Sequence, residues 1–280
     1  MTGPAVTAAW PEQAPGHHRR HQNTPICATI ATNAADVPAA PNEVDIACRT
    51  TYYAAVLAAI SAGNHRRSEI AAALGRPSGA LAHLLTGLQD IGLVEHLDDA
   101  LRGKRSVFRI TEPIVRLHQL ITGRYEPELV AGRAARVWAR SAGTVSTQIY
   151  GPHFEDLARR WCLEHAQDET VGGVPASVRP TEVPCREHRD RHELDIVITD
   201  DPAAGRVIAI GEAKAAATPV EARELRRLEH LRGLLPSARV GQPPKLLLFG
   251  RSGFAPELTA EAAARPDVEL IDLDRLYHGS

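Results

Sequence analysis

The chain has 280 residues, 44% of them hydrophobic, which is enough to bury the cores of about two domains. Its formal net charge of −2 excludes a strong overall attraction to nucleic acid or to acidic membranes, so any basic surface must be local. No apolar run of about 18 residues and no basic start followed by an apolar core is present, so we expect neither a membrane span nor a secretory signal. Four scattered cysteines fit reduced thiols and favour a cytoplasmic protein.

Residues 1–45 are rich in Pro, Ala, Thr and His and lack a sustained apolar period. This composition predicts a disordered tail, because such a segment cannot bury enough apolar surface to fold. The stretch HHRRH at 17–21 contains metal-binding residue types, although a solvated polar tract is the simpler interpretation.

Three helices are predicted within residues 46–122. Apolar residues recur at helical spacing in TYYAAVLAAISAGN, in RSEIAAALG and over 78–90, and each segment ends at a glycine. Two strand-like runs follow, LVEHLD and SVFRI, separated by DALRGKR. Three helices and a hairpin are the order of a winged helix-turn-helix domain, which these phrases resemble. Residues 123–145 predict a helical connector, with a boundary at the SAGTVS stretch around Gly143.

DNA contacts are predicted on this winged helix. Residues 45–125 hold ten Lys or Arg against seven Asp or Glu, a net charge of +3. The hairpin tip predicts phosphate contacts by Arg102, Lys104 and Arg105. The third helix, over 78–90, contains no Lys or Arg, and its polar candidates for base edges are His83, Thr86 and Gln89. Because the commonest specific contacts are Arg or Lys to guanine, a packing or protein-contact role stays equally open.

Three segments of the C-terminal part carry acidic residues in positions expected to be buried. A helix beginning at Gly151-Pro152 places Glu155 beside its apolar stripe. In HELDIVITDD, alternation puts Leu194, Ile196 and Ile198 on one face of a strand and Asp195 with Val197 on the other. In VIAIGEAK, the same alternation puts four residues on one face: Ile208, Ile210, Glu212 and Lys214. Neighbouring strands are then expected to bring Asp195 and Glu212 together at their ends.

Lys214 stands out because the chain has 29 arginines and only three lysines. An arginine would serve a surface salt bridge equally well, whereas a compact ammonium suits a catalytic position better. Two converging carboxylates repel each other unless a cation lies between them, and oxygen ligands suit Mg²⁺ or Mn²⁺. The simpler alternative for Glu212 and Lys214 is an edge-strand salt bridge of little energetic value.

Together, a helix-borne Glu, a strand Asp and Glu-x-Lys on the next strand resemble the PD-(D/E)XK nuclease superfamily. More narrowly, residues 50–280 resemble the C-terminal part of a prokaryotic family of P-loop ATPases, in which a winged helix and a nuclease-like domain of unknown function follow the ATPase domain. The supporting phrases are GPHFEDLARRW, HELDIVITD, GEAK, PKLLLFGRSGF and VELIDLDRLY. The resemblance implies that Asp195 and Glu212 hold Mg²⁺ or Mn²⁺, that Lys214 orients water and that Glu155 assists.

For residues 146–280 the resemblance implies a restriction-endonuclease-like α/β domain, a mixed sheet flanked by helices. A helix over 219–235 between strands at 207–214 and 244–250 predicts a parallel pair, and a last strand is expected at 268–273. The phosphate-binding loop of an ATPase is absent, so we expect no ATP binding. The chain is then a shortened relative, or another chain supplies the ATPase.

Two functions follow from these features. One is Mg²⁺-dependent hydrolysis of DNA; the alternative is a non-catalytic DNA-binding or protein-interaction module derived from the C-terminus of an ATPase. Arg226, Arg227 and His230 on the helix after Glu-x-Lys are further candidates for facing DNA. Finally, CREHRDRH gives Cys185, His188 and His192 zinc-like spacing, but no fourth ligand is evident and a polar hairpin is the simpler interpretation.

Overall fold

The computed structural model describes residues 43–103, 105–185, 189–203 and 205–279, with residues 43–50 described by their backbone alone. The chain divides into two units, residues 1–48 and 49–280. The predicted tail therefore lies almost wholly outside the described residues, as does the HHRRH stretch. No helix in the described part of the chain is long and apolar enough to cross a membrane.

The first elements are three helices and an antiparallel pair of strands. They are α1 (Glu43–Ser61), α2 (Arg67–Ala73), a 3-10 turn (Ser78–Leu81), α3 (Ala82–Asp90), β1 (Val94–Asp98) and β2 (Ser106–Ile110). The predicted third helix is thus a 3-10 turn followed by α3. Gly63, Gly75 and Gly92 follow the helices with φ of +96°, +61° and +71°, as expected for glycine stops. Within residues 49–110, apolar side chains of all six elements share one core.

A series of short helices connects β2 to the larger sheet. It comprises α4 (Pro113–Leu117), a π turn (His118–Thr122), α5 (Glu126–Val130), α6 (Ala134–Thr144), a second π turn (Val145–Tyr150), α7 (Gly151–Glu164) and α8 (Asp168–Val171). Helical turns continue from 134 to 164, so the domain boundary expected around Gly143 lies within a run of helical turns and stays a prediction. A helical glycine costs about 1 kcal/mol, and burial of Val137, Val145 and Ile149 in a common cluster offsets it.

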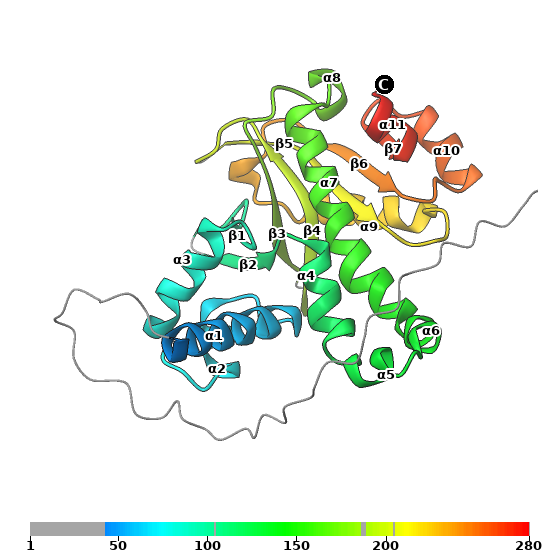
Figure 1. The fold of residues 1–280 in the computed structure, drawn as a ribbon. Coiled ribbons are helices and arrows are strands. Elements are labelled where there is room, and N and C mark those ends of the chain that lie inside the picture. The colour runs from blue at the N-terminus through cyan, green and yellow to red at the C-terminus, as the bar shows by residue number, and fades with distance from the viewer. Residues whose placement is uncertain (1–42, 104, 186–188, 204, 280) are drawn as a thin grey trace, which may run out of the picture. The chain divides into compact units, whose positions relative to one another are not determined.

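The second sheet has five strands in the order β3-β4-β5-β6-β7 (Figure 1). Its elements are β3 (Ser177–Cys185), β4 (Asp190–Thr199), β5 (Val207–Lys214), α9 (Ala222–Gly233), a 3-10 turn (Ser237–Arg239), β6 (Lys245–Gly250), α10 (Pro256–Ala263), β7 (Val268–Asp272) and α11 (Leu273–His278). The strands β3, β4 and β5 pair antiparallel, whereas β5, β6 and β7 pair parallel. The predicted mixed α/β sheet is therefore confirmed.

Helices cover both faces of this sheet. On one face, leucines of α9 and α10 share a core with Val197 and Ile210. On the other face α7 packs with Phe154, Ala158 and Trp161 onto Ile196 and Phe249 (Figure 1). The result is three layers, α/β/α, with α7 and α9 on opposite sides of β4 and β5.

Strict alternation, as predicted for β4 and β5, is wrong at two points. Arg179 lies opposite Val197 but Thr181 lies opposite Leu194, so β4 contains one extra residue at Asp195–Ile196. Leu194 consequently packs with Val197 in the α9 core, and not with Ile196 in the α7 core. Such a bulge redirects side chains locally.

A second bulge lies in β5. Ile198 pairs with Ala209 and Thr199 with Val207, which leaves Ile208 as the extra residue. Ile208 therefore packs on the α7 side while Ile210 packs on the α9 side. From Ile210 onward the alternation is regular, which keeps Glu212 and Lys214 on the α9 side.

Candidate functional site

Two carboxylates, Asp195 of β4 and Glu212 of β5, are buried on neighbouring strands, with 8% and 5% of their surfaces exposed. The β4 bulge turns Asp195 toward β5, where its Oδ2 accepts a hydrogen bond of 2.9 Å from the backbone N–H of Ala213. Asp195 is thus anchored to the backbone of the residue that follows Glu212. The sequence-predicted pair lies at one place in the sheet.

Burial raises the pKa of Asp195 well above its ordinary value, and the nearby carboxylates of Glu212 and Glu155 raise this pKa further. The Ala213 N–H opposes the shift but does not outweigh it. Glu155 reaches this point from α7, on the other face of the sheet from α9. Three of the four predicted residues therefore interact electrostatically, and their mutual repulsion is of the kind that a bound cation relieves.

The fourth residue, Lys214, pairs directly with Glu212. Its Nζ lies 2.7 Å from Oε1 of Glu212 and 3.5 Å from Oε2 of Glu224 on α9. Burial lowers the pKa of Lys214, but the two glutamates outweigh it and leave the pKa raised. The lysine is consequently a fixed positive charge at the C-terminal end of β5.

The second carboxylate oxygen of Glu212, Oε2, faces an arginine of α9. Arg227 Nη1 of α9 lies 2.7 Å from Oε2, close enough for an ion pair, yet this buried oxygen accepts no hydrogen bond from any described residue. Arg227 Nη2 instead donates a bond of 3.1 Å to the backbone carbonyl of Glu193. The Arg227 guanidinium thus already opposes this oxygen as an ion pair, and a further ligand would have to displace it.

Glu155 is held by arginines. Arg109 of β2 donates a hydrogen bond of 2.9 Å to its Oε2 and contacts Glu193 Oε1 at 3.0 Å. Burial lowers the pKa of Arg109, but Glu155 and Glu193 raise it more strongly. Arg159 of α7 lies 3.8 Å from the same Glu155 oxygen and donates a bond of 3.0 Å to the carbonyl of Asp195.

Sequence reasoning missed two of these arginines, Arg109 and Arg159, and gave Arg227 only a role toward DNA. Arg159 was detectable, since it follows Glu155 by four residues on a helix and therefore lies on the same face. Arg109 and Arg227 had no signal, because 29 arginines make any single one inconspicuous. Of the other candidates on α9, Arg226 is exposed and His230 lies beside Cys185.

The chemistry of Asp195 and Glu212 fits Mg²⁺ or Mn²⁺, which take oxygen ligands. The observation that carries this fit is that both carboxylates are buried on neighbouring strands, where their charges repel each other. Within the described residues, one group of three metal-ligating side chains has all its ligand atoms within 4.8 Å of one another, and it is Cys185, His192 and His230. A metal held by Asp195 and Glu212 would therefore use two protein carboxylates and displace Arg227.

The predicted base-reading residues lie on an exposed surface. His83 and Gln89 of α3 are exposed, whereas Leu84, Leu85 and Leu88 are buried. The amphipathic division expected for this helix is therefore present.

The loop between β1 and β2 contacts β3. Ala100 N–H donates to the carbonyl of Pro180 at 3.0 Å, and the Thr181 hydroxyl donates to Asp99 Oδ1 at 2.7 Å. Arg105 is exposed and lies 3.9 Å from Glu182 of β3, while Arg102 is half-buried. Lys104 lies outside the described residues. Part of the loop's basic charge is thus already opposed by a carboxylate.

No family model, no curated protein and no solved structure matches the chain.

Proposed function

We propose that the chain hydrolyses DNA phosphodiesters with Mg²⁺ or Mn²⁺ bound by Asp195 and Glu212. The observation that carries the proposal is a pair of buried carboxylates on neighbouring strands, Asp195 and Glu212, beside a lysine whose Nζ lies 2.7 Å from Glu212 Oε1. The order of helix Glu155, strand Asp195 and strand Glu212-x-Lys214 on a mixed sheet supports a restriction-endonuclease-like domain of the PD-(D/E)XK type.

Each residue has a distinct role in this proposal. Asp195 is positioned by the Ala213 N–H, and Lys214 by Glu212 and Glu224. When bound, such an ion polarises a phosphodiester and makes water a better nucleophile. Lys214 orients that water and stabilises negative charge as it develops on the phosphate oxygens, which a point charge does well. Glu155 assists from α7 once Arg109 releases it.

The deciding experiment is isothermal titration of Mn²⁺ into the wild type, Asp195→Ala and Asp190→Ala, followed by plasmid nicking with all three. Asp190 is the matched control because it is an exposed aspartate of the same strand. We expect binding and nicking in the wild type and in Asp190→Ala, and neither in Asp195→Ala. A folded wild type that binds no Mn²⁺ would refute the proposal.

A second candidate function is a non-catalytic module that binds DNA or protein, as in a chain derived from the C-terminus of an ATPase. One observation favours it: Lys214 and Arg227 already neutralise Glu212, so this carboxylate is compensated without a metal. The Mn²⁺ titration separates the two functions. An ATPase supplied by another chain stays a prediction.

The order of α1, α2, α3, β1 and β2 supports a winged helix, and we propose that it binds DNA. For Arg102→Gln/Arg105→Gln we expect weaker binding and a salt slope, log K against log [salt], shallower by at most about 1.8, since each phosphate contact contributes about 0.9. Fluorescence anisotropy with a DNA duplex at several salt concentrations measures both quantities.

The matched control for this prediction is Arg133→Gln/Arg136→Gln, which removes the same charge from exposed positions of the α6 region. His83→Ala/Gln89→Ala should weaken binding without changing the salt slope, because neither side chain needs to meet a phosphate. Equal slopes in the loop variant and the wild type would assign the loop to packing on β3.

A further inference from the structure

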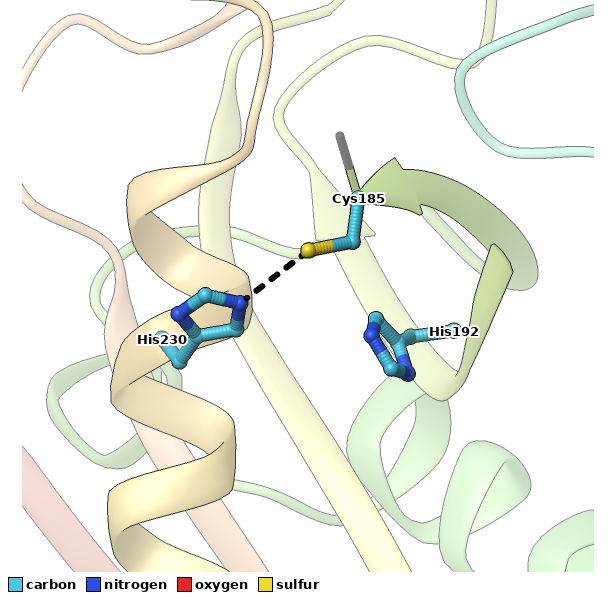
Figure 2. Close-up of side chains that lie close together, drawn as sticks. All are labelled: Cys185, His192 and His230. Carbon is cyan, nitrogen blue, oxygen red and sulfur yellow. Dashed lines mark hydrogen bonds between the residues drawn. The ribbon is translucent and has the colours of Figure 1, made fainter. Parts of the chain in front are cut away.

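A second cluster of reactive side chains lies away from the carboxylates. Cys185 ends β3, His192 lies near the start of β4 and His230 lies on α9, so the cluster joins a strand hairpin to a helix (Figure 2). The thiol sulfur and one nitrogen from each ring all lie within 4.8 Å of one another. Cys185 is buried, and both histidines are half-buried.

The distances in this cluster approach those of a zinc site. Zinc bonds of about 2.3 Å to sulfur and about 2.0–2.1 Å to nitrogen, in tetrahedral geometry, separate a sulfur and a nitrogen ligand by about 3.6 Å. Cys185 Sγ lies 3.5 Å from His230 Nε2. The rings of His192 and His230 are nearly perpendicular, at 83°, with centroids 6.3 Å apart, so they approach the sulfur from different directions (Figure 2).

The donor atoms also select the metal. A thiolate with two imidazoles suits Zn²⁺ and disfavours Mg²⁺, which prefers oxygen ligands. The zinc-like spacing of Cys185, His188 and His192 in the sequence points to the same hairpin. His188 lies outside the described residues, and His230, from a distant helix, is the third member of the described cluster. The sequence spacing thus predicted Cys185 and His192 but could not predict His230.

We propose that Cys185, His192 and His230 bind one Zn²⁺, which fastens α9 to the β3–β4 hairpin. The three described side chains supply three of the four ligands of a tetrahedral zinc site. On α9, His230 lies three residues after Arg227 and therefore on the same side of the helix. Arg227 contacts both Glu212 and the carbonyl of Glu193, so the ion would also fix the helix that neutralises Glu212. The zinc site does not depend on nuclease activity.

Cobalt is the probe for this site, because Co²⁺ replaces Zn²⁺ and a cobalt–thiolate bond gives a charge-transfer absorption in the near ultraviolet. We expect this band when Co²⁺ is titrated into the reduced, full-length protein, and its loss when Zn²⁺ is added. Cys185→Ser should abolish the band. His192→Gln and His230→Gln should each weaken Co²⁺ binding by about a hundredfold or more.

Two matched controls accompany these variants. Cys162→Ala removes another cysteine, which is buried in α7, and His165→Gln removes an exposed histidine. Both should keep the band and the Co²⁺ affinity of the wild type. Zn²⁺ should also raise the melting temperature of the wild type and of these controls, but not that of Cys185→Ser.

Two outcomes would overturn the assignment. One is a folded, reduced wild type that shows no thiolate band with Co²⁺. The other is a band that survives Cys185→Ser, which would place the metal on a different cysteine. Should Cys185→Ser lose its far-ultraviolet circular dichroism signal, His192→Gln decides, because wild-type Co²⁺ affinity in that variant contradicts the site. The cobalt–thiolate band depends on Cys185 and on neither Asp195 nor Glu212. A failure of the nuclease proposal would therefore leave the zinc result intact.

Discussion

Lys214→Met is expected to lower the rate of Mn²⁺-dependent nicking by about 100- to 1,000-fold, the usual effect of removing a group that stabilises transition-state charge. The Mn²⁺ affinity should stay equal or increase. Lys214 Nζ is a cation 2.7 Å from Glu212 Oε1, and its removal leaves this carboxylate more negative for the metal. Nicking at saturating Mn²⁺, together with isothermal titration of the same preparations, separates the two effects.

Lys245→Met is the matched control for this variant. Lys245 of β6 pairs with Glu269 at 3.1 Å and is likewise a partly buried lysine of the same sheet. Its loss should leave nicking unchanged. Lys214→Arg should also be slow, because a planar guanidinium cannot approach the water as a point charge. Wild-type rates in Lys214→Met would assign Lys214 to a structural ion pair.

Apolar runs were sufficient to predict most of the large sheet. The strands β4 to β7 and helix α9 were all expected, because buried strands and amphipathic helices leave a strong hydrophobic pattern. Strand β3 was missed, since Pro180 and Pro184 argue against a strand. Both prolines are tolerated because β3 pairs with β4 alone and forms an edge of the sheet.

The candidate site was less predictable than the sheet. Alternation correctly indicated that Asp195 and Glu212 are buried, but it could not reveal the bulge that turns Asp195 toward Ala213. The arginines around the carboxylates depend on contacts between distant segments, such as the 46 residues that separate Arg109 from Glu155. Local sequence patterns do not contain such contacts. His230 shows the same limit, since a helix position gives no indication of a partner on another strand.

Asp195→Asn is expected to make the protein more stable when no Mg²⁺ or Mn²⁺ is present. Burial, Glu212 and Glu155 raise the pKa of Asp195 in the folded state, so the folded protein holds this proton more tightly than the unfolded chain. Stability must then fall as the pH rises from the unfolded pKa of about 3.9 through the raised folded value. Asparagine still accepts the Ala213 hydrogen bond but carries no charge.

The free energy of unfolding of Asp195→Asn should exceed that of the wild type by about 1–2 kcal/mol at a pH well above the raised pKa, or roughly 2–8 °C in Tm. This gain should vanish in acid, where Asp195 itself is neutral. Asp190→Asn, on the exposed part of β4, should change Tm little at any pH.

Adding Mn²⁺ should make the wild type more stable than Asp195→Asn, because Mn²⁺ stabilises the folded wild type and the variant lacks one of the ligands that bind the ion. Thermal melts between pH 5 and 9, with and without Mn²⁺, test both the pH-dependent stabilisation of Asp195→Asn and its reversal by the metal. A variant less stable than the wild type at pH 8 without Mn²⁺ would mean that Arg159 and Lys214 already compensate the buried charge, and the site would then have no need of a metal.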